Sequence, residues 1–307
     1  MEPTASLNLP YHIPALLPEA LQLLDIKPNG TYIDATFGGG GHSRAIMQRL
    51  DKQGRLFSFD RDMDAYRNRI EDERFTFVHG NFRHIENFMK FYEVEKVDGI
   101  LADFGVSFHH FDTPERGFSF RHDALLDMRM NQASSKTAAD LLAEADEKKL
   151  NEIFRAYADL KKPGAVVKAL ISAKEKNPIQ TTIQLAETLK GIIDPRQEKK
   201  EMAQVFQALR IAVNNEAEDL KKFLDSTLNV LKPGGRLVTL TYHSMEDRMV
   251  KNFFKTGNIE GKEEKDFFGN IASKWKLITR KPIEATPEEV ENNPRARSAK
   301  LRAAELL

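Results

Sequence analysis

Residues 32–43 read YIDATFGGGGHS, a short apolar run that ends in four consecutive glycines. Residues 31–35 have the composition of a buried strand, and residues 43–50 follow with helical spacing. Glycines directly after a first strand let the backbone approach a ligand closely, and the helix that follows offers unpaired N–H groups to an anion. The stretch therefore predicts a nucleotide-binding loop at the edge of an α/β sheet.

Two carboxylates downstream support this prediction. Asp60 ends an apolar run at residues 54–60, and its separation of 26 residues from Asp34 fits one βαβ unit. A carboxylate there can accept both hydrogens of a ribose diol, although Asp60 could instead only cap the next helix. Asp103 ends a further apolar run within ADFGVS. The carboxyl edge of a parallel sheet faces the ligand crevice, so Asp103 is a candidate for the reacting centre, with a plain turn cap as the alternative.

The loop and Asp60 together indicate a cofactor that contains adenosine. A dinucleotide loop reads G-x-G-x-x-G, and Ser43 stands where the third glycine would fall counting from Gly38. No lysine for a diphosphate follows the loop, which suits a smaller anion such as an amino-acid carboxylate. S-adenosylmethionine is therefore favoured over a dinucleotide. Two alternatives stay open: a nicotinamide dehydrogenase, and an RNA-binding protein that keeps the fold only as a scaffold.

The rest of the chain predicts one sheet that a helical segment interrupts. Besides residues 31–35, strand patterns occur at 54–60, 75–80, 97–105, 236–243, 274–283 and 298–306. Helical patterns separate the early strands, one of them running from about residue 61 to 70, which predicts a parallel sheet with helices on both faces. Between about 107 and 210 only helical patterns occur, with starts at Thr137, Lys148, Ala165 and Thr182, and an amphipathic run then extends from Val205 to Leu228. We expect a sheet domain made of residues 1–106 and 211–307, and an all-helical insertion at 107–210 that recognises the substrate.

Composition narrows the class of protein. Of the 307 residues, 41% are hydrophobic and 30% charged, as in a soluble globular protein, and no apolar run approaches the ~18–20 residues of a membrane span. The N-terminus lacks the features of a secretory signal, so we expect a cytoplasmic protein. The 46 basic and 46 acidic residues give a net charge of zero, so any surface that binds nucleic acid must be a local basic patch. The chain has no cysteine, which excludes disulfides and any thiol nucleophile.

Several long motifs, in order along nearly the whole chain, resemble one bacterial family. They are YHIPALLPEAL, YIDATFGGGGHS, RGFSF with LDMRMN, FQALRIAVNNE, GGRLV, YHSMEDRMVKNFF and NPRARSAKLR. The chain resembles the ribosomal RNA small-subunit methyltransferase H family, also called MraW. The resemblance implies a Rossmann-like fold with an inserted helical domain, and an enzyme that uses S-adenosylmethionine. It also implies the substrate, the N4 amino group of a cytidine in the decoding region of 16S rRNA within the small ribosomal subunit.

The resemblance also assigns cofactor-binding positions. They are Gly40, Gly41, His42, Asp60, Phe82, Asp103 and His110, and His110 stands in GVSFHH where the family normally has glutamine. Two other stretches depart from the family: YADLKKPGA replaces a GEE-like run, and TYHSMEDR replaces SFHSLEDR. These differences bear on RNA contacts and efficiency more than on the class of reaction.

For the reaction we expect direct methyl transfer without a metal ion. Asp103, or the carbonyls of residues 104 and 105, would accept the N–H groups of the cytosine amine, and His109, His110 and Asp112 are interpreted as crevice or surface residues. Candidate substrate contacts are Arg116, His243, Ser244, Arg295 and Arg297. We expect a monomer or weak homodimer that binds neither DNA nor a membrane.

Overall fold

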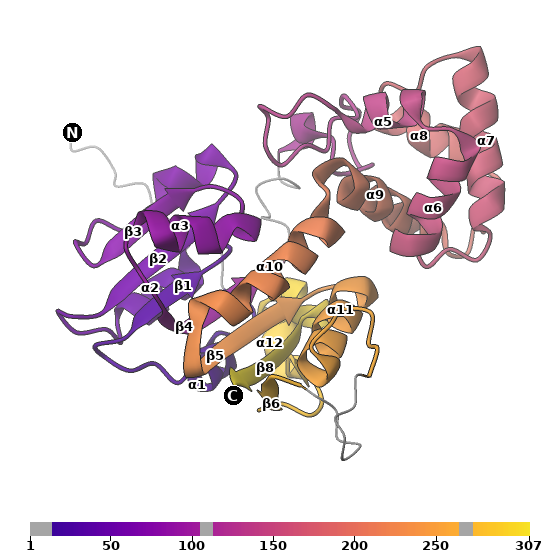
Figure 1. Ribbon diagram of the computed structural model, residues 1–307. Helices are drawn as coiled ribbons and strands as arrows, with labels where there is room; N and C mark the ends of the chain where they lie inside the picture. Colours follow the sequence, from indigo (N-terminus) through magenta and orange to yellow (C-terminus); the bar gives the residue numbers. More distant parts are fainter. Residues whose placement is uncertain (1–13, 105–112, 264–272) are drawn as a thin grey trace, which may run out of the picture. The chain divides into compact units, whose positions relative to one another are not determined.

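The computed structural model describes residues 14–104, 113–263 and 273–307 and separates into two compact units (Figure 1). One unit contains the described residues up to 104 together with 220–307, and the other contains residues 113–219. A sheet with helices forms the first unit and helices form the second, so the predicted fold class is confirmed. The predicted domain bounds at 106 and 210 stay a prediction.

One mixed sheet forms the centre of the first unit, in the order β3-β2-β1-β4-β5-β8-β6, with β7 also paired to β8. Its strands are β1 (Thr31–Asp34), β2 (Arg55–Asp60), β3 (Phe75–His79), β4 (Val97–Asp103), β5 (Leu231–Thr241), β6 (Trp275–Leu277), β7 (Ile283–Glu284) and β8 (Lys300–Leu306). The first five run parallel, whereas β8 is antiparallel to β5, β6 and β7. The chain moves outward from β1 to β3 and then returns to β4 on the other side of β1. The carboxyl ends of β1 and β4 therefore border the switch point, where α/β sheets hold ligands.

Helices cover both faces of this sheet. They are α1 (Leu17–Leu24), α2 (Gly41–Met47), α3 (Ile85–Phe91), α10 (Glu216–Val230), α11 (Ser244–Thr256) and α12 (Pro287–Asn292). Leu56 of β2 joins the apolar core that contains residues of α1 and α2. Its neighbour Phe57 points to the opposite face and packs on Tyr92, just after α3, with a ring distance of 5.3 Å. Alternation along the strand therefore produces three layers.

Several expectations for this unit are wrong in detail. The strand expected at 274–283 is two separate strands, β6 and β7. The segment after β2 forms a short 3-10 helix, Met63–Asn68, instead of an α-helix reaching residue 70, because Arg69 is already extended. Strand β5 begins before the predicted residue 236, since residues 232–235 loop out between two paired stretches of the strand. It ends before the predicted residue 243, because His243 becomes the N-cap of α11.

The second unit is a helical assembly with its own apolar core. Its helices are α5 (Ala138–Glu144), α6 (Glu147–Tyr157), α7 (Pro163–Lys176), α8 (Thr182–Leu189) and α9 (Glu198–Asn214). Thr181, not the predicted Thr182, caps α8, because its hydroxyl accepts from the backbone N–H of Gln184 in a capping box. The predicted run from Val205 to Leu228 is broken at Asn215, whose left-handed backbone (φ 52°) separates α9 from α10. None of the helices in the described ranges has the length and apolarity that crossing a bilayer requires.

A buried ion pair joins α11 to β8 in the first unit. The Nε of Arg302 donates to Oδ1 of Asp247 at 2.7 Å, and its second nitrogen lies 3.2 Å from Oδ2. Both side chains are largely buried, at 8% and 14% exposure. Removing one partner of such a pair leaves the other as an uncompensated charge.

We therefore expect Asp247→Asn to lower the free energy of unfolding by about 3–5 kcal/mol, because the guanidinium of Arg302 would stay buried beside a neutral amide. Urea unfolding followed by circular dichroism measures this loss. Glu260→Gln is the matched control: its pair with Lys221 is about half-exposed, at 47% and 43%, so its loss should stay below about 1 kcal/mol. Equal losses for the two variants would contradict the prediction.

Candidate functional site

A buried carboxylate, Asp34 at the end of β1, fixes the start of the candidate site. Its Oδ2 accepts a 2.5 Å hydrogen bond from the hydroxyl of Ser43 in α2, and its Oδ1 accepts from the backbone N–H of Thr36 at 3.1 Å. The Ser43 hydroxyl also lies 2.8 Å from that of Ser58 in β2. Burial raises the pKa of Asp34, and this effect is partly offset by the nearby His42 and by the hydrogen bonds from Ser43 and Thr36. Thr36 and Ser43, at the two ends of the glycine loop, are thus both hydrogen-bonded to the buried carboxylate of Asp34.

Between these ends, the loop leaves no room for side chains at Gly40 and Gly41. A Cβ on Gly40, which has φ +74°, would lie 2.5 Å from Nη1 of Arg44, and a Cβ on Gly41 would lie 2.3 Å from Cγ of Pro14. Side chains also hold the loop carbonyls: Arg44 donates to the carbonyl of Gly39 at 2.6 Å, and Asn68 donates to that of Gly38 at 3.2 Å. The glycine backbone is therefore fixed in place, and the chain's own side chains cover it at Gly40 and Gly41.

Asp60, at the end of β2, faces this loop. Its Oδ2 accepts from the N–H of Gly38 and its Oδ1 from the N–H of Asp62, both at 2.8 Å. Burial raises its pKa to about 6, although these two hydrogen bonds oppose the shift. Each carboxylate oxygen keeps a second lone pair, so Asp60 can accept two further hydrogen bonds. The carboxylate is thus suited to a diol.

Asp103, at the end of β4, lies at the neighbouring position of the same edge. Its N–H donates to the hydroxyl of Thr36 at 2.7 Å. Its carboxylate lies 3.9 Å from Nδ1 of His42 and near the hydroxyl of Tyr242, whose pKa it helps to raise. The ring of His42 is buried, and its Nε2 has no hydrogen-bond partner within the described parts of the chain. A buried polar atom of this kind awaits a ligand or a water molecule.

Aromatic rings complete this part of the edge. Phe82 after β3, Phe104 after β4 and Phe223 of α10 pack in three edge-to-face pairs, with centroids 5.3–5.8 Å apart. Phe223 and Phe104 are buried, and Phe82 is partly exposed. Such a cluster provides an apolar wall on which a flat heterocycle can rest.

The residues present fit the predicted adenosyl cofactor on three separate observations. Gly38 (φ +51°) faces open space where a Cβ would stand, so a ligand can approach the loop backbone there. Asp60 has free acceptor positions for a ribose, and the buried Nε2 of His42 needs a polar partner. The chain brings these groups together with Phe82 and Asp103, although their roles in binding stay predictions.

The predicted substrate residues lie at several places. His243 is the N-cap of α11, with Nε2 3.3 Å from Oε1 of Glu246, and Ser244 is exposed beside it. Arg295 and Arg297 are exposed on a 3-10 turn at Pro294–Ser298. The predictions for residues 105, 109, 110 and 112, including the cofactor contact of His110, lie outside the described residues.

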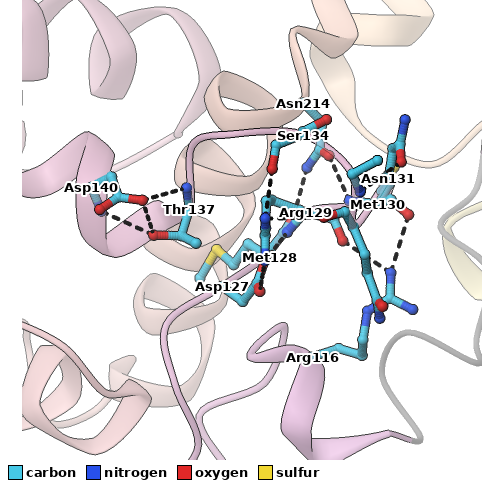
Figure 2. Close-up of polar contacts among 12 residues, drawn as sticks. Arg116, Asp127, Met128, Arg129, Met130, Asn131, Ser134, Thr137, Asp140 and Asn214 are labelled. Atoms are coloured by element: carbon cyan, nitrogen blue, oxygen red, sulfur yellow. Dashed lines mark hydrogen bonds and ion pairs between the residues drawn. The ribbon is translucent and has the colours of Figure 1, made fainter.

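The side chain of Arg116 holds a loop within the helical unit. Its guanidinium is buried and donates to the carbonyls of Arg129 and Met130 at 3.0 and 3.1 Å (Figure 2). Asn214 of α9 holds the same loop, since it accepts from the N–H of Met130 and donates to the carbonyl of Met128, both at 2.7 Å. These contacts explain why RGFSF, LDMRMN and FQALRIAVNNE occur together, and a substrate contact by Arg116 stays a prediction without support from its position.

Sequence reasoning missed several members of the site. Thr36, Ser43 and Ser58 look like ordinary small polar residues in the sequence, and Phe223 is more than a hundred residues from Phe104. Tyr242 directly precedes the predicted His243. Its place near Asp103 follows from the pairing of Asp103 with Leu240, two residues earlier, and that pairing is visible only in the structure.

Comparisons with known proteins agree with this geometry. A sequence profile of the MraW methylase family matches residues 10–307. A ribosomal RNA small subunit methyltransferase H from Phocaeicola vulgatus is 55% identical over 295 residues, which cover 96% of this chain and 97% of that protein. The protein of the same name from Christiangramia forsetii is 50% identical over 297 residues, covering 97% and 98%.

Solved structures give more distant matches. TrmN from Thermus thermophilus aligns with 95% of this chain and 48% of its own, at 12% identity and a TM-score of 0.43. A methyltransferase from Streptococcus mutans in complex with SAH aligns over 96% of this chain and 100% of its own, also at 12% identity and a TM-score of 0.43.

The raised pKa of Asp60 predicts a pH dependence of stability. The folded protein holds the Asp60 proton more tightly than the unfolded chain does, so the contribution of this group is greatest below pH 3.8 and is lost as the pH rises to about 6. Between pH 4 and 7, the free energy of unfolding of the wild type relative to Asp60→Asn should therefore fall by roughly 2 kcal/mol. Denaturant titrations at several pH values measure the difference.

Asp72→Asn is the control with the opposite sign. Hydrogen bonds from the side chain and backbone of Arg74 lower the pKa of Asp72 to about 2, so its contribution is present above pH 3.8 and is lost as the pH falls toward 2. A difference between the wild type and Asp60→Asn that does not vary with pH would overturn the assignment of a raised pKa.

Proposed function

The chain belongs to the MraW methylase family, and on this basis we propose that it methylates the N4 amino group of a cytidine in the decoding region of 16S rRNA. The observation that carries the proposal is the meeting of the glycine loop, Asp60 and Asp103 at one edge of the sheet. S-adenosylmethionine is the methyl donor, and the small ribosomal subunit in the cytoplasm is the partner.

The site suits an adenosyl sulfonium better than a dinucleotide. Asp60 would accept the ribose hydroxyls, and the aromatic cluster of Phe82, Phe104 and Phe223 would support the adenine. The open backbone at Gly38 and the buried Nε2 of His42, which has no partner among the described residues, would bind the amino-acid end. No diphosphate-binding lysine lies in the loop.

The acceptor chemistry follows from the cytosine amine itself. Its lone pair is delocalised into the ring, and transfer of the methyl group to the nitrogen requires the loss of one N–H proton. The carboxylate of Asp103, or the carbonyl of Phe104, would accept a hydrogen bond from the amine. As the new N–C bond forms, the S–C bond of the sulfonium breaks with its electrons to sulfur, and the N–H proton would pass to the carboxylate of Asp103 or to solvent. Holding donor and acceptor in line can supply about 7–11 kcal/mol of barrier reduction, and the absence of cysteine agrees with transfer without a covalent adduct.

RNA contacts would come from local features, because the net charge is zero. The helical unit contains a cavity of about 670 Å³ whose lining includes Lys136, Lys149 and Tyr157 together with Glu152 and Glu218. The two lysines pair with Glu144 and Glu152, so RNA phosphates would have to compete with these carboxylates. Arg295 and Arg297 are exposed in the other unit. The target base would leave its stack to enter the site, at a cost of a few kcal/mol.

Nucleoside mass spectrometry tests the proposed reaction. Small subunits from cells that lack this protein, incubated with it and isotope-labelled S-adenosylmethionine, should gain one labelled methyl group on N4 of one cytidine. Asp103→Ala should reduce the rate at least 100-fold, because it removes the carboxylate at the reacting edge. Unlabelled RNA after incubation with the wild type would refute the proposal, and binding of NAD in place of S-adenosylmethionine would favour a dehydrogenase.

The affinity for the cofactor should depend on the protonation of Asp60. Ribose hydroxyls favour the ionised carboxylate, so the Kd for S-adenosylmethionine should rise up to tenfold per pH unit below about pH 6 and stay level from there to pH 7. Isothermal titration calorimetry measures the trend. Asp60→Asn should bind more weakly and show no such slope, and an identical slope in this variant would rule out Asp60 as the titrating group.

A further inference from the structure

Residues 274–284 form the outer margin of the sheet, beyond β8. They include β6 and β7, which both pair with β8 in antiparallel register. Within the described ranges, no strand pairs with the other side of this margin. Four of its eleven residues are basic, and only Glu284 is acidic. Because the whole chain has a net charge of zero, the margin is a local basic surface.

A bulge takes part of this margin out of the pairing ladder. Trp275 faces Leu306, whereas Ile283 faces Leu301, so eight steps along the margin span only five along β8. The three extra residues are 280–282, because the two residues before them still donate to a carbonyl of β8. They are an arginine, a lysine and a proline, and both cations are exposed. Bulges re-aim side chains, and a proline costs no ladder hydrogen bond there.

The protein leaves most of the positive charge of the margin unneutralised. Lys276 lies 3.2 Å from Glu305. The side chains of Lys274, Arg280 and Lys281 are exposed and make neither a hydrogen bond nor an ion pair within the part of the chain that the structure describes. A phosphate can therefore approach three of these cations without displacing a carboxylate, unlike at the lysines of the cavity in the helical unit.

Strand pairing places the bulge near the reacting edge. Asp103 faces Leu240 of β5, which in turn faces Leu301 of β8. Leu301 faces Ile283, directly after the bulge. This row crosses three spacings between neighbouring strands, so the backbone of Ile283 lies about 14 Å from that of Asp103. RNA whose target base enters the site therefore has neighbouring phosphates within reach of the bulge.

We propose that Lys274, Lys276, Arg280 and Lys281, the basic margin, bind the phosphate backbone of the RNA that flanks the target cytidine. The inference rests on the proposed function and adds to it a docking surface on the outer strands. Contacts between such cations and phosphates release counterions from the RNA, which makes the affinity depend on salt. They read no base, so the margin positions the RNA without selecting its sequence.

The salt dependence of RNA binding tests this surface. Arg280→Gln combined with Lys281→Gln removes both charges of the bulge. Fluorescence anisotropy with a labelled fragment of 16S rRNA that contains the decoding region gives the slope of log Kd against log salt concentration. For this variant the slope should fall by about 1.5, because each phosphate contact contributes roughly 0.7–0.9, and the Kd at about 0.1 M salt should rise on the order of tenfold.

Arg49→Gln combined with Lys52→Gln is the matched control. These two side chains are also exposed and also lack polar partners within the described ranges, but they lie between α2 and β2, at the opposite edge of the sheet. Their removal should leave the slope unchanged. An unchanged slope for the glutamine variant of the bulge, or an equal change in the control, would overturn the proposal.

A charge-conserving variant separates phosphate binding from protection of the sheet edge. Lysines on an edge strand also prevent pairing between molecules, and their loss then produces aggregates. Arg280→Lys combined with Lys281→Arg keeps both charges and should keep the wild-type slope. Size-exclusion chromatography verifies that every variant stays in the same oligomeric state as the wild type.

Small ribosomal subunits distinguish RNA from protein as the partner. Weaker binding of the glutamine variant to subunits, with unchanged binding to the RNA fragment, would identify an acidic protein surface and sink the assignment to RNA. In steady-state methylation the KM for subunits should rise with kcat unchanged, because a phosphate contact stabilises the ground state and the transition state equally. If the wild type transfers no methyl group, the proposed function fails by itself, and the anisotropy still decides whether the margin binds RNA.

Discussion

The hydrogen bonds to the buried carboxylate of Asp34 are the constraint on which the site depends. Consecutive glycines lose more conformational entropy on folding than other residues do, so a bare glycine loop needs fixed ends. Ser43 and Thr36 supply them by donating to Asp34, and Ser58 joins the same group from β2. Thr36 then accepts from the backbone of Asp103. The ends of β1, β2 and β4 and the start of α2 are thus joined through one network of short polar side chains.

This network places two carboxylates in different surroundings at one edge. Asp60 faces backbone N–H groups and has its pKa raised to about 6 by burial, whereas Asp103 faces the side chains of His42 and Tyr242. Backbone donors cannot move, so Asp60 is suited to a ligand group that is the same in every turnover. Side chains can adjust, so under the proposed function Asp103 would meet the groups whose positions change as bonds form and break.

The sequence predicted the parts of this site that depend on local pattern. Strand periodicity and the glycine run gave the loop, Asp60 and Asp103, because each of them ends a strand at the same edge. It did not predict Phe223 or Tyr242, since their contacts depend on pairing between segments far apart in the chain. It also misplaced the start of β5, where residues 232–235 loop out of a strand that begins earlier. Pattern reasoning takes such a Pro-Gly-Gly stretch as a turn between elements.

Motif residues with charged side chains need not be ligand contacts. In the helical unit, the guanidinium of Arg116 is buried against loop carbonyls, and Arg129 pairs with Asp127 at 2.7 Å. Asn214 closes the same loop from α9, and Arg210, one turn earlier, forms a buried pair with Glu216 across the break before α10. Burying an unpaired charge costs free energy, so these side chains keep their partners and thereby hold the loop in one conformation. Under the proposed function, recognition of RNA by this unit would rest on side chains that remain exposed, and the motif residues would supply the rigid frame from which those side chains project.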